Sequence, residues 1–282
     1  MQFSTPLRYP GGKGRLGHWL AQLLRHNRIS GGCYVEPYAG GAGAAIHLLT
    51  KGYVNHIVIN DADPVVYAFW AAAVQHAEQF LLLLKETAVN MESWYRQKEI
   101  HEAPEKYDIV EVGFATFFLN RTNRSGILAG GVIGGKDQTG PYKLDARFNK
   151  TDLAERIRLL GELKKHIGIY GCDAIEFLRG IEDQLPSNSL IYCDPPYYHK
   201  GSQLYRNFYK PDDHQEIATA VSQLNKPWLV TYDDCPEIHA LYSAHNRADF
   251  SLVYSTAQAR TLGSEVMYYS GVQLHELPAL RR

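Results

Sequence analysis

The sequence has few cysteines, no long apolar run and almost no net charge, and each of these shortages excludes a class of protein. The four cysteines, Cys33, Cys172, Cys193 and Cys235, are scattered without a Cys-x-x-Cys pair. We therefore expect neither a disulfide framework nor a cysteine-rich zinc site. No window approaches the length of a membrane span, and the N-terminus lacks an apolar signal region. These absences predict a cytoplasmic protein with no membrane partner.

The formal net charge is −1, so the overall balance does not indicate nucleic acid, but the charges are unevenly placed. Residues 1–35 contain five basic residues and no acid, and residues 121–150 contain six basic residues against two acids. Two local basic patches on a neutral protein are compatible with a phosphate-binding cleft. The 282 residues, 45% of them hydrophobic, are enough for one large domain or for a core with a sizeable insertion.

Strand and helix patterns alternate along the chain, which is typical of an α/β doubly wound sheet. A strand at 33–36 leads into a glycine-rich turn and a helix at 44–50, and a strand at 57–60 then ends at Asp61. An acid about 20 residues after such a glycine turn is the pattern of a nucleotide-binding unit. The other expected elements are helices at 64–89, 107–119, 151–165, 174–179 and 211–224, and strands at 167–170, 190–193, 228–232, 249–254 and 265–270.

Three acids, Asp61, Asp173 and Asp194, directly follow predicted strands or the turn after one. Because ligands of doubly wound sheets bind at the carboxyl ends of the strands, these acids are expected to share one site. Asp173 is equally suited to cap the helix that follows it. Residues 120–150 hold six glycines and show little periodicity, and an irregular segment of this length is usually functional or mobile.

The apolar run 190–193 stops at Asp194-Pro195-Pro196-Tyr197, and this turn suits the methylation of an exocyclic base amine. Each proline fixes its φ near about −65° and has no N–H, so the turn is stiff. The Asp194 carboxylate and the Pro195 carbonyl could bind both amino hydrogens, which would favour a pyramidal nitrogen and expose its lone pair. Tyr197 offers a flat face on which a base can stack. Taken alone, the turn is also compatible with an ordinary loop after a buried strand.

Seven motifs in a fixed order make the chain resemble the Dam-type DNA N6-adenine methyltransferases of the α group over nearly its whole length. They are Arg8-Tyr9-Pro10-Gly11-Gly12-Lys13, Glu36-Pro37-Tyr38-Ala39-Gly40-Gly41, Asn60-Asp61, Phe118-Leu119-Asn120-Arg121-Thr122, Ser125-Gly126-Ile127, the turn at 194–197, and Asn207-Phe208-Tyr209 with Asp213-His214. The resemblance implies a doubly wound, mostly parallel Rossmann-like methyltransferase sheet with an inserted, mainly helical target-recognition domain. It divides the chain into a cofactor half at 1–64, the DNA-binding insertion at 65–150 and a catalytic half at 151–282.

The resemblance also implies a function, which is methyl transfer from S-adenosylmethionine to an adenine flipped out of double-stranded DNA. The implied catalytic residues are Asp194, Pro195, Pro196 and Tyr197. The implied cofactor contacts are Tyr9, Lys13 near the methionine carboxylate, Glu36 and Gly40 at the methionine end, Asp61 at the ribose hydroxyls, Asp173 at the adenine amine, and Asp194. The implied DNA contacts are Asn120, Arg121, Arg124, Ser125 and Lys136. The reaction requires no metal and no cysteine nucleophile.

One departure from the family pattern concerns the target sequence. Members that methylate GATC carry Asn-Gly-Leu followed by an arginine that reads a guanine. This chain carries Ser125-Gly126-Ile127 followed by Leu128-Ala129-Gly130-Gly131, with Ala129 at the arginine position. GATC specificity is therefore in doubt, and the glycine-rich stretch is expected to fold differently or to order on DNA.

The residues leave other functions open. One is methylation of an amine elsewhere, in RNA adenine or in protein glutamine, although the glutamine enzymes favour Asn where this chain has Asp194. Another is a catalytically idle, cofactor-sensing DNA-binding protein. We expect a monomer, with a dimer as the alternative, associated with the nucleoid, and a role in host regulation, restriction–modification or phage biology.

Overall fold

A computed structural model of the chain describes residues 5–8, 13–199, 209–255 and 260–278. The chain forms two compact units. We call Met1–Gly12 with Asp63–Ile169 the helical unit, and Lys13–Ala62 with Tyr170–Arg282 the sheet unit. Across the described ranges, none of the helices combines the length and the apolar character needed to cross a membrane.

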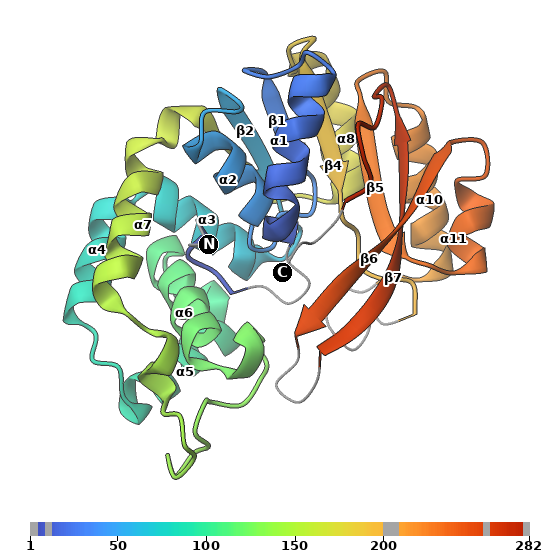
Figure 1. The fold of residues 1–282 in the computed structure, drawn as a ribbon. Helices are drawn as coiled ribbons and strands as arrows, with labels where there is room; N and C mark the ends of the chain where they lie inside the picture. The colour runs from blue at the N-terminus through green and yellow to red at the C-terminus, as the bar shows by residue number, and fades with distance from the viewer. Residues whose placement is uncertain (1–4, 9–12, 200–208, 256–259, 279–282) are drawn as a thin grey trace. The chain divides into compact units, whose positions relative to one another are not determined.

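Seven strands form one sheet in the order β3-β2-β1-β4-β5-β7-β6 (Figure 1). β1 pairs in parallel with β2 and with β4, and β4 pairs in parallel with β5. β7 is antiparallel to both β5 and β6. The mostly parallel sheet confirms the predicted fold class. The strands are β1 (Cys33–Glu36), β2 (His56–Asn60), β3 (Ile167–Tyr170), β4 (Ser189–Cys193), β5 (Trp228–Asp233), β6 (Asn246–Ser255) and β7 (Arg260–Ser270).

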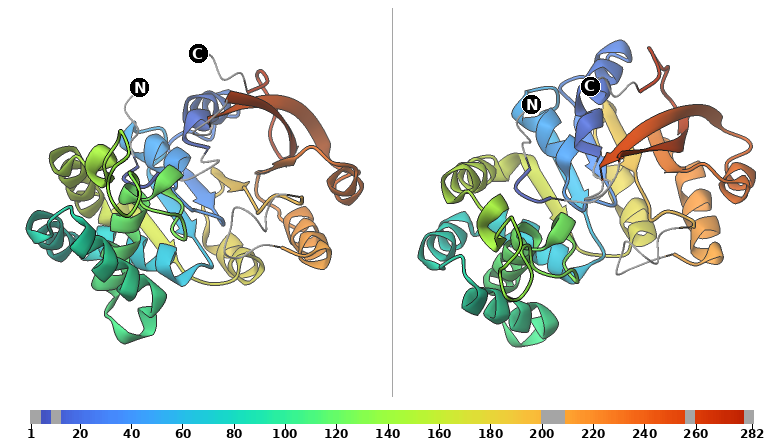
Figure 2. Two further views of the ribbon diagram at one scale, coloured as in Figure 1. Left: turned by 90° about the horizontal axis from the view of Figure 1, so that it is seen from below. Right: turned by 60° about the horizontal axis from the view of Figure 1, so that its bottom comes forward.

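Helices lie on both faces of this sheet (Figures 1 and 2). One face carries Val35, Ile191 and Val230, which form a core with side chains of α8, α10 and α11. Successive side chains of a strand point to opposite faces, so Tyr34 and Tyr192 lie on the other face, where their rings stack with centroids 6.4 Å apart. The helices of the sheet unit are η1 (Lys13–Leu16), α1 (Gly17–His26), α2 (Gly43–Thr50), α8 (Ala174–Ile181), η6 (Glu182–Gln184), α10 (Pro211–Ser222) and α11 (Pro236–Leu241).

The helical unit is built around α6, which is apolar on every side and buried along nearly its whole length. The ring centroid of Phe117 in this helix lies within 6.2 Å of those of Phe69 and Phe80, and 5.5 Å from that of Phe148. Asp108 begins α6 with a capping box. The elements of the unit are α3 (Pro64–Gln75), α4 (Ala77–Glu86), α5 (Met91–Glu102), η2 (Pro104–Lys106), α6 (Ile109–Thr122), η3 (Arg124–Gly126), η4 (Leu144–Arg147), α7 (Lys150–Glu162) and η5 (Lys164–His166).

Most predicted elements are present, but the single helix expected over 64–89 was wrong. The chain leaves helical geometry at His76, with φ −121° and ψ 36°, so that α3 and α4 are separate helices. The helices α1, α5 and α11 were not predicted. Residues 123–149 are irregular, as expected for most of 120–150, and beyond the two short 3₁₀ turns they contain one isolated bridge between Asn123 and Val132.

The compact units also differ from the division at residues 64 and 150 that the sequence suggested. The helical unit extends to Ile169, because α7 packs on α3 and α4. It also takes in the N-terminal segment, since Arg156 Nη1 donates to the Thr5 carbonyl at 2.8 Å. The family resemblance placed the boundary at 150, whereas packing decides to which unit a helix belongs. Target recognition by the helical unit stays a prediction.

Candidate active site

The carboxyl ends of β1, β2 and β4 meet at one edge of the sheet. The registers pair Glu36 with Ile59 and Val35 with Ile191, so Asp61 and Asp194 follow their strands at the same end as Glu36. The strand order reverses between β1 and β4, which makes this the topological switch point where open α/β sheets bind ligands.

Asn60, the last residue of β2, ties two loops together at this edge. Its side chain is fully buried, and its amide nitrogen donates to the carbonyls of Pro37 and Cys172, each at 3.0 Å. Its amide oxygen accepts from the Cys172 backbone N–H at 3.1 Å. The loops after β1 and β3 are therefore fixed against the end of β2. Cutting this side chain would leave buried backbone groups unpaired.

The glycine turn between β1 and α2 is held by two carboxylates. Asp61 Oδ2 accepts from the Gly40 backbone N–H at 2.8 Å. Glu36 Oε1 accepts from the Ala45 N–H at 3.2 Å, which satisfies a donor in the first turn of α2. Gly40 and Ala42 have φ of 45° and 42°, a region that glycine adopts most easily. The turn therefore bends tightly and brings backbone rather than bulky side chains to the switch point.

Glu36 is a buried carboxyl, 5% exposed, beside a second carboxylate. Burial raises the pKa of Glu36 to about 8, and the negative charge of Asp194 acts in the same direction. The hydrogen bond from Ala45 opposes this rise. At neutral pH, Glu36 is therefore mostly protonated.

Asp194 is half-buried just beyond the end of β4, and its orientation is set from the neighbouring strand. Thr231 Oγ1 donates to Asp194 Oδ1 at 2.7 Å. The Thr231 hydroxyl also shares a 2.9 Å hydrogen bond with the Tyr192 hydroxyl. This chain of contacts lies between β4 and β5 and holds the carboxylate at the switch point.

The rest of the Asp-Pro-Pro-Tyr turn is packed into the sheet unit. Pro195 and Pro196 are buried, and Tyr197 is 8% exposed. The Tyr197 hydroxyl donates to Oε1 of the buried Glu265 at 2.6 Å, which anchors the ring against β7. An anchored ring can present a fixed face to a base.

Aromatic rings pack against the residues that follow the Asp-Pro-Pro-Tyr turn. The buried His214 of α10 has ring centroids 5.0 Å from Tyr198 and 5.4 Å from Tyr209. Its Nδ1 lies 3.2 Å from the Tyr232 hydroxyl, and burial lowers its pKa. The Tyr209 hydroxyl lies 2.8 Å from that of Tyr38, in the turn after β1. The two loops that flank the switch point are thus joined through tyrosines.

The remaining predicted cofactor residues fall in different places. Tyr9 lies outside the described residues, as do Asn207 and Phe208. Lys13 begins η1, but its side chain is also outside the described part of the chain. Asp173 is exposed, and its Oδ1 accepts from the N–H groups of Ile175 and Glu176, so it caps α8. Its contact with a cofactor stays a prediction.

Two of the predicted DNA contacts are partly or fully buried in the helical unit. Asn120 is 2% exposed, because its side chain accepts from the Arg8 N–H at 2.7 Å and donates to the carbonyls of Arg8 and Gly126. Arg121 is half-buried, and its Nε donates to the Arg147 carbonyl at 2.8 Å. Burial disfavours direct DNA contact by Asn120, whose amide already binds backbone groups.

The other predicted DNA contacts, Arg124, Ser125 and Lys136, are exposed. Ser125 adopts φ 58°, and Gly126 follows with φ 77°. A Cβ on Gly126 would lie 2.1 Å from the Arg8 carbonyl oxygen, so only glycine fits there. The motif is therefore shaped by the N-terminal segment packed beneath it.

Three residues of the site were missed by the sequence reading: Thr231, Asp233 and Glu265. Asp233 accepts from the backbone N–H groups of Tyr198 at 2.9 Å and His199 at 3.3 Å, and so fixes the chain just after the turn. Each left a signal in the sequence. Thr231 is a hydroxyl residue in a mostly apolar strand, Asp233 directly follows the strand predicted at 228–232, and Glu265 is a charged residue at the start of the strand predicted at 265–270.

Comparison with known proteins gives one strong match. The profile of the family described as D12 class N6 adenine-specific DNA methyltransferase matches residues 9–259. A search of curated proteins found no match to this chain.

Three solved structures are similar to the chain at low identity. A candidate RNA methyltransferase from Pyrococcus horikoshii has 12% identity and a TM-score of 0.44, over 95% of this chain and 87% of that chain. A SAM-dependent methyltransferase from Agrobacterium tumefaciens has 11% identity and a TM-score of 0.41, over 92% and 62%. A precorrin 8W decarboxylase from Methanobacterium thermoautotrophicum has 10% identity and a TM-score of 0.38, over 91% and 89%.

The raised pKa of Glu36 predicts that stability falls as pH rises. An unfolded glutamate loses its proton near about pH 4.3, whereas Glu36 in the folded protein keeps it to about pH 8. Between these values the folded state binds the extra proton, so the free energy of unfolding decreases with rising pH. Glu36→Gln cannot ionise and should lose part of this decrease, measured by urea unfolding at about pH 5 and about pH 8.

The control is Glu176→Gln, because Glu176 is an exposed glutamate on α8. This variant should keep the pH dependence of the wild type. An identical decrease in Glu36→Gln and wild type would show that Glu36 ionises as an ordinary exposed carboxyl.

Proposed function

Because the chain belongs to the D12 class N6 adenine-specific DNA methyltransferases, we propose that it methylates N6 of an adenine flipped out of double-stranded DNA. S-adenosylmethionine is the methyl donor of such an enzyme. The observation that carries the proposal is the position of Asp194 at the switch point, oriented by Thr231 and followed by two buried prolines.

The residues of the sheet unit fit S-adenosylmethionine. The tight turn at Gly40 allows a ligand to approach the backbone closely, and Asp61 is a half-exposed carboxylate at the end of β2, where ribose hydroxyls are bound in related sheets. Glu36, Gly40 and Asp61 would hold the cofactor, with Tyr9, Lys13 and Asp173 as further contacts. The cofactor supplies an electrophilic methyl group when bound.

Asp194 and Pro195 would act on the target amine. The amino nitrogen of adenine is a poor nucleophile, because its lone pair is delocalised into the ring. A carboxylate oxygen of Asp194 and the Pro195 carbonyl accept hydrogen bonds from the two N–H groups of this amine. These hydrogen bonds favour a pyramidal amino nitrogen, whose lone pair is available. Tyr197 stacks on the extruded base, which returns roughly 1–3 kcal/mol of the cost of flipping.

The protonation state of Glu36 supports this role of Asp194. The raised pKa of Glu36 reduces the negative charge beside Asp194 near neutral pH. The Asp194 carboxylate then accepts the proton that the amine loses after methyl transfer. Positioning of the amine accounts for the rest of the acceleration, because the two reactants are held in one orientation.

Four arginines of the helical unit form a positively charged cluster suited to DNA phosphate. Burial, followed by the positive charges of Arg8 and Arg156, lowers the pKa of Arg121 to about 10. Burial, with Arg147 nearby, also lowers the pKa of Arg8. Asp152 neutralises part of this charge through its 2.9 Å ion pair with Arg156. The remaining arginines repel one another, and a phosphate bound between them would relieve this repulsion. We call Arg8, Arg121, Arg147 and Arg156 the arginine cluster.

The loop beside this cluster is closed by its own hydrogen bonds. The Asn123 amide donates to the carbonyls of Ile127 and Leu128 at 3.1 and 2.9 Å, and the Arg124 N–H donates to the Gly131 carbonyl at 3.0 Å. Trp94 Nε1 donates to Asn123 Oδ1 from α5. The loop thus has a defined shape of its own, with exposed Ala129 at the position of the guanine-reading arginine. We therefore propose a target sequence other than GATC.

Asp194→Ala should lower methyl transfer by about 100-fold or more, because it removes an acceptor that acts on the reacting amine. The measurement is transfer of label from methyl-labelled S-adenosylmethionine to double-stranded DNA of mixed sequence and, in parallel, to RNA. The unfolding midpoint is measured on the same variant and should change little. Cofactor affinity is measured in parallel, so that a loss of binding is separated from a loss of methyl transfer.

Asp212→Ala is the matched control, since Asp212 is an exposed acid in the first turn of α10. It should retain wild-type labelling. Label in RNA alone would overturn the DNA substrate, and cofactor binding without label in any DNA would show an idle protein. Wild-type activity in Asp194→Ala would contradict the role of Asp194 in methyl transfer.

Arg147→Ala should weaken DNA binding and make it less dependent on salt. Its side chain is exposed within the arginine cluster, and each lost phosphate contact lowers the slope of log affinity against log salt by about 0.9. The measurement is DNA affinity at several salt concentrations, with cofactor affinity as a second readout.

Arg158→Ala is the control, because Arg158 is also exposed but lies on a different face of α7 from Arg156. Equal slopes for both variants and the wild type would exclude the arginine cluster from phosphate binding. A loss of cofactor affinity in Arg147→Ala would show that Arg147 acts at the cofactor site and not at the DNA.

A further inference from the structure

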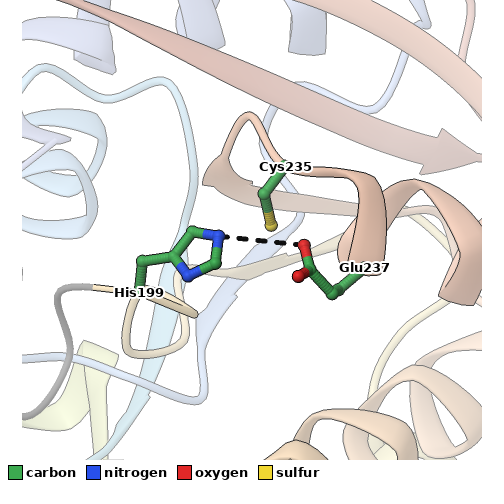
Figure 3. Close-up of side chains that lie close together, drawn as sticks. All are labelled: His199, Cys235 and Glu237. Atoms are coloured by element: carbon green, nitrogen blue, oxygen red, sulfur yellow. Dashed lines mark ion pairs between the residues drawn. The ribbon is translucent and has the colours of Figure 1, made fainter.

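Three metal-ligating side chains converge on the sheet unit, outside the residues assigned to methyl transfer. His199 lies two residues after Tyr197, and Cys235 and Glu237 lie at the start of α11. Their ligand atoms are all within 4.8 Å of one another. Figure 3 shows the three side chains pointing toward a common point, with His199 Nε2 3.7 Å from Glu237 Oε2.

The backbone that carries these side chains is fixed. Asp233 Oδ2 accepts from the His199 N–H at 3.3 Å and holds it against the end of β5. Cys235 is the extended N-cap residue of α11, with φ −147° and ψ 152°, and Pro236 sets the first helical position. Ligands on a constrained backbone lose little freedom when they bind a metal.

A thiol, an imidazole and a carboxylate together are a donor set that suits zinc. Zinc bonds of about 2.0–2.3 Å in a tetrahedron place neighbouring ligand atoms about 3.3–3.8 Å apart. For a nitrogen and an oxygen ligand the separation is about 3.3–3.5 Å, so the 3.7 Å between His199 Nε2 and Glu237 Oε2 would have to shorten only slightly. The sulfur of Cys235, whose residue is 4% exposed, lies on the protein side, while His199 and Glu237 are exposed.

The local charge also favours a cation. Residues 233–237 contain three acids and neither lysine nor arginine. The nearby Arg247 is paired with Asp249 at 2.8 Å and contacts Asp234 at 3.7 Å. His239 lies 2.6 Å from Asp234 and is likewise engaged. Neither Arg247 nor His239 is paired with Glu237, whose carboxylate lies beside His199. Both side chains could coordinate the same ion.

We propose that His199, Cys235 and Glu237 bind one Zn²⁺ ion, with water as the fourth ligand. The ion would join the chain just after the Asp-Pro-Pro-Tyr turn to the loop after β5. Methyl transfer itself does not pass through this site. Metal binding would stabilise the folded state, because the three ligands come together only after folding.

The test uses the untagged, full-length chain after removal of metal with a chelator. Zinc is titrated against a coloured competing chelator, and unfolding is followed with and without zinc. We expect one zinc per chain and a thermal midpoint that rises with zinc concentration. Cobalt(II) should give a sulfur-to-metal charge-transfer band, which requires the Cys235 thiolate.

Variants separate this site from nonspecific binding. Glu237→Gln and His199→Asn replace exposed side chains, so both variants should fold normally. Each should lower the zinc affinity by more than about tenfold, because mutation of groups that merely support metal ligands already lowers metal affinity by about this factor. Cys235→Ser should abolish the cobalt band. Cys172→Ser is the control, because Cys172 is a partly exposed thiol outside the proposed site, and it should change neither readout.

Two results would overturn the proposal. One is a wild-type chain that binds less than one zinc at micromolar metal. The other is zinc binding that Glu237→Gln and His199→Asn leave unchanged, which would place the metal elsewhere on the surface.

Discussion

The hydrogen bond from Thr231 to Asp194 is the contact on which the proposed chemistry depends. Asp194 follows a buried strand by one residue, and the two prolines after it stiffen the turn. Without a partner, the carboxylate could rotate into solvent. Thr231 on β5 gives it one orientation, and Glu36 on β1 lies close enough for the two carboxyl groups to influence each other's charge. The switch point thus obtains its chemistry from three neighbouring parallel strands.

The two units contribute different physical properties to the proposed reaction. The sheet unit fixes groups by buried hydrogen bonds, of which those of Asn60 are the most complete. The helical unit gathers positive charge at the arginine cluster and displays a closed loop beside it. Arg8 contributes to both features of the helical unit. Its side chain belongs to the arginine cluster, and its backbone is held by Asn120 under the loop at 125–126.

The sequence predicted the sheet and the residues at its carboxyl edge, because strand alternation and parallel pairing place such residues together whatever the details. It did not predict Thr231, Glu265 or the multiple bonds of Asn60. These contacts join residues far apart in sequence, and no local pattern encodes them. Asn120 shows the opposite error: a polar residue in a recognition motif was expected to face DNA, whereas packing of the N-terminal segment buries it. The break at His76 falls in the mostly polar stretch 75–79, between two apolar segments that were read as one helix.

The central claim is that Asp194 and Pro195 together bind the amino group of an extruded adenine. The most direct measurement is a crystal structure with a cofactor product and a DNA duplex that contains the methylation site. The account predicts the adenine N6 within hydrogen-bond distance of both an Asp194 carboxylate oxygen and the Pro195 carbonyl. An adenine still stacked in the duplex, or an Asp194 side chain turned away from N6, would contradict it.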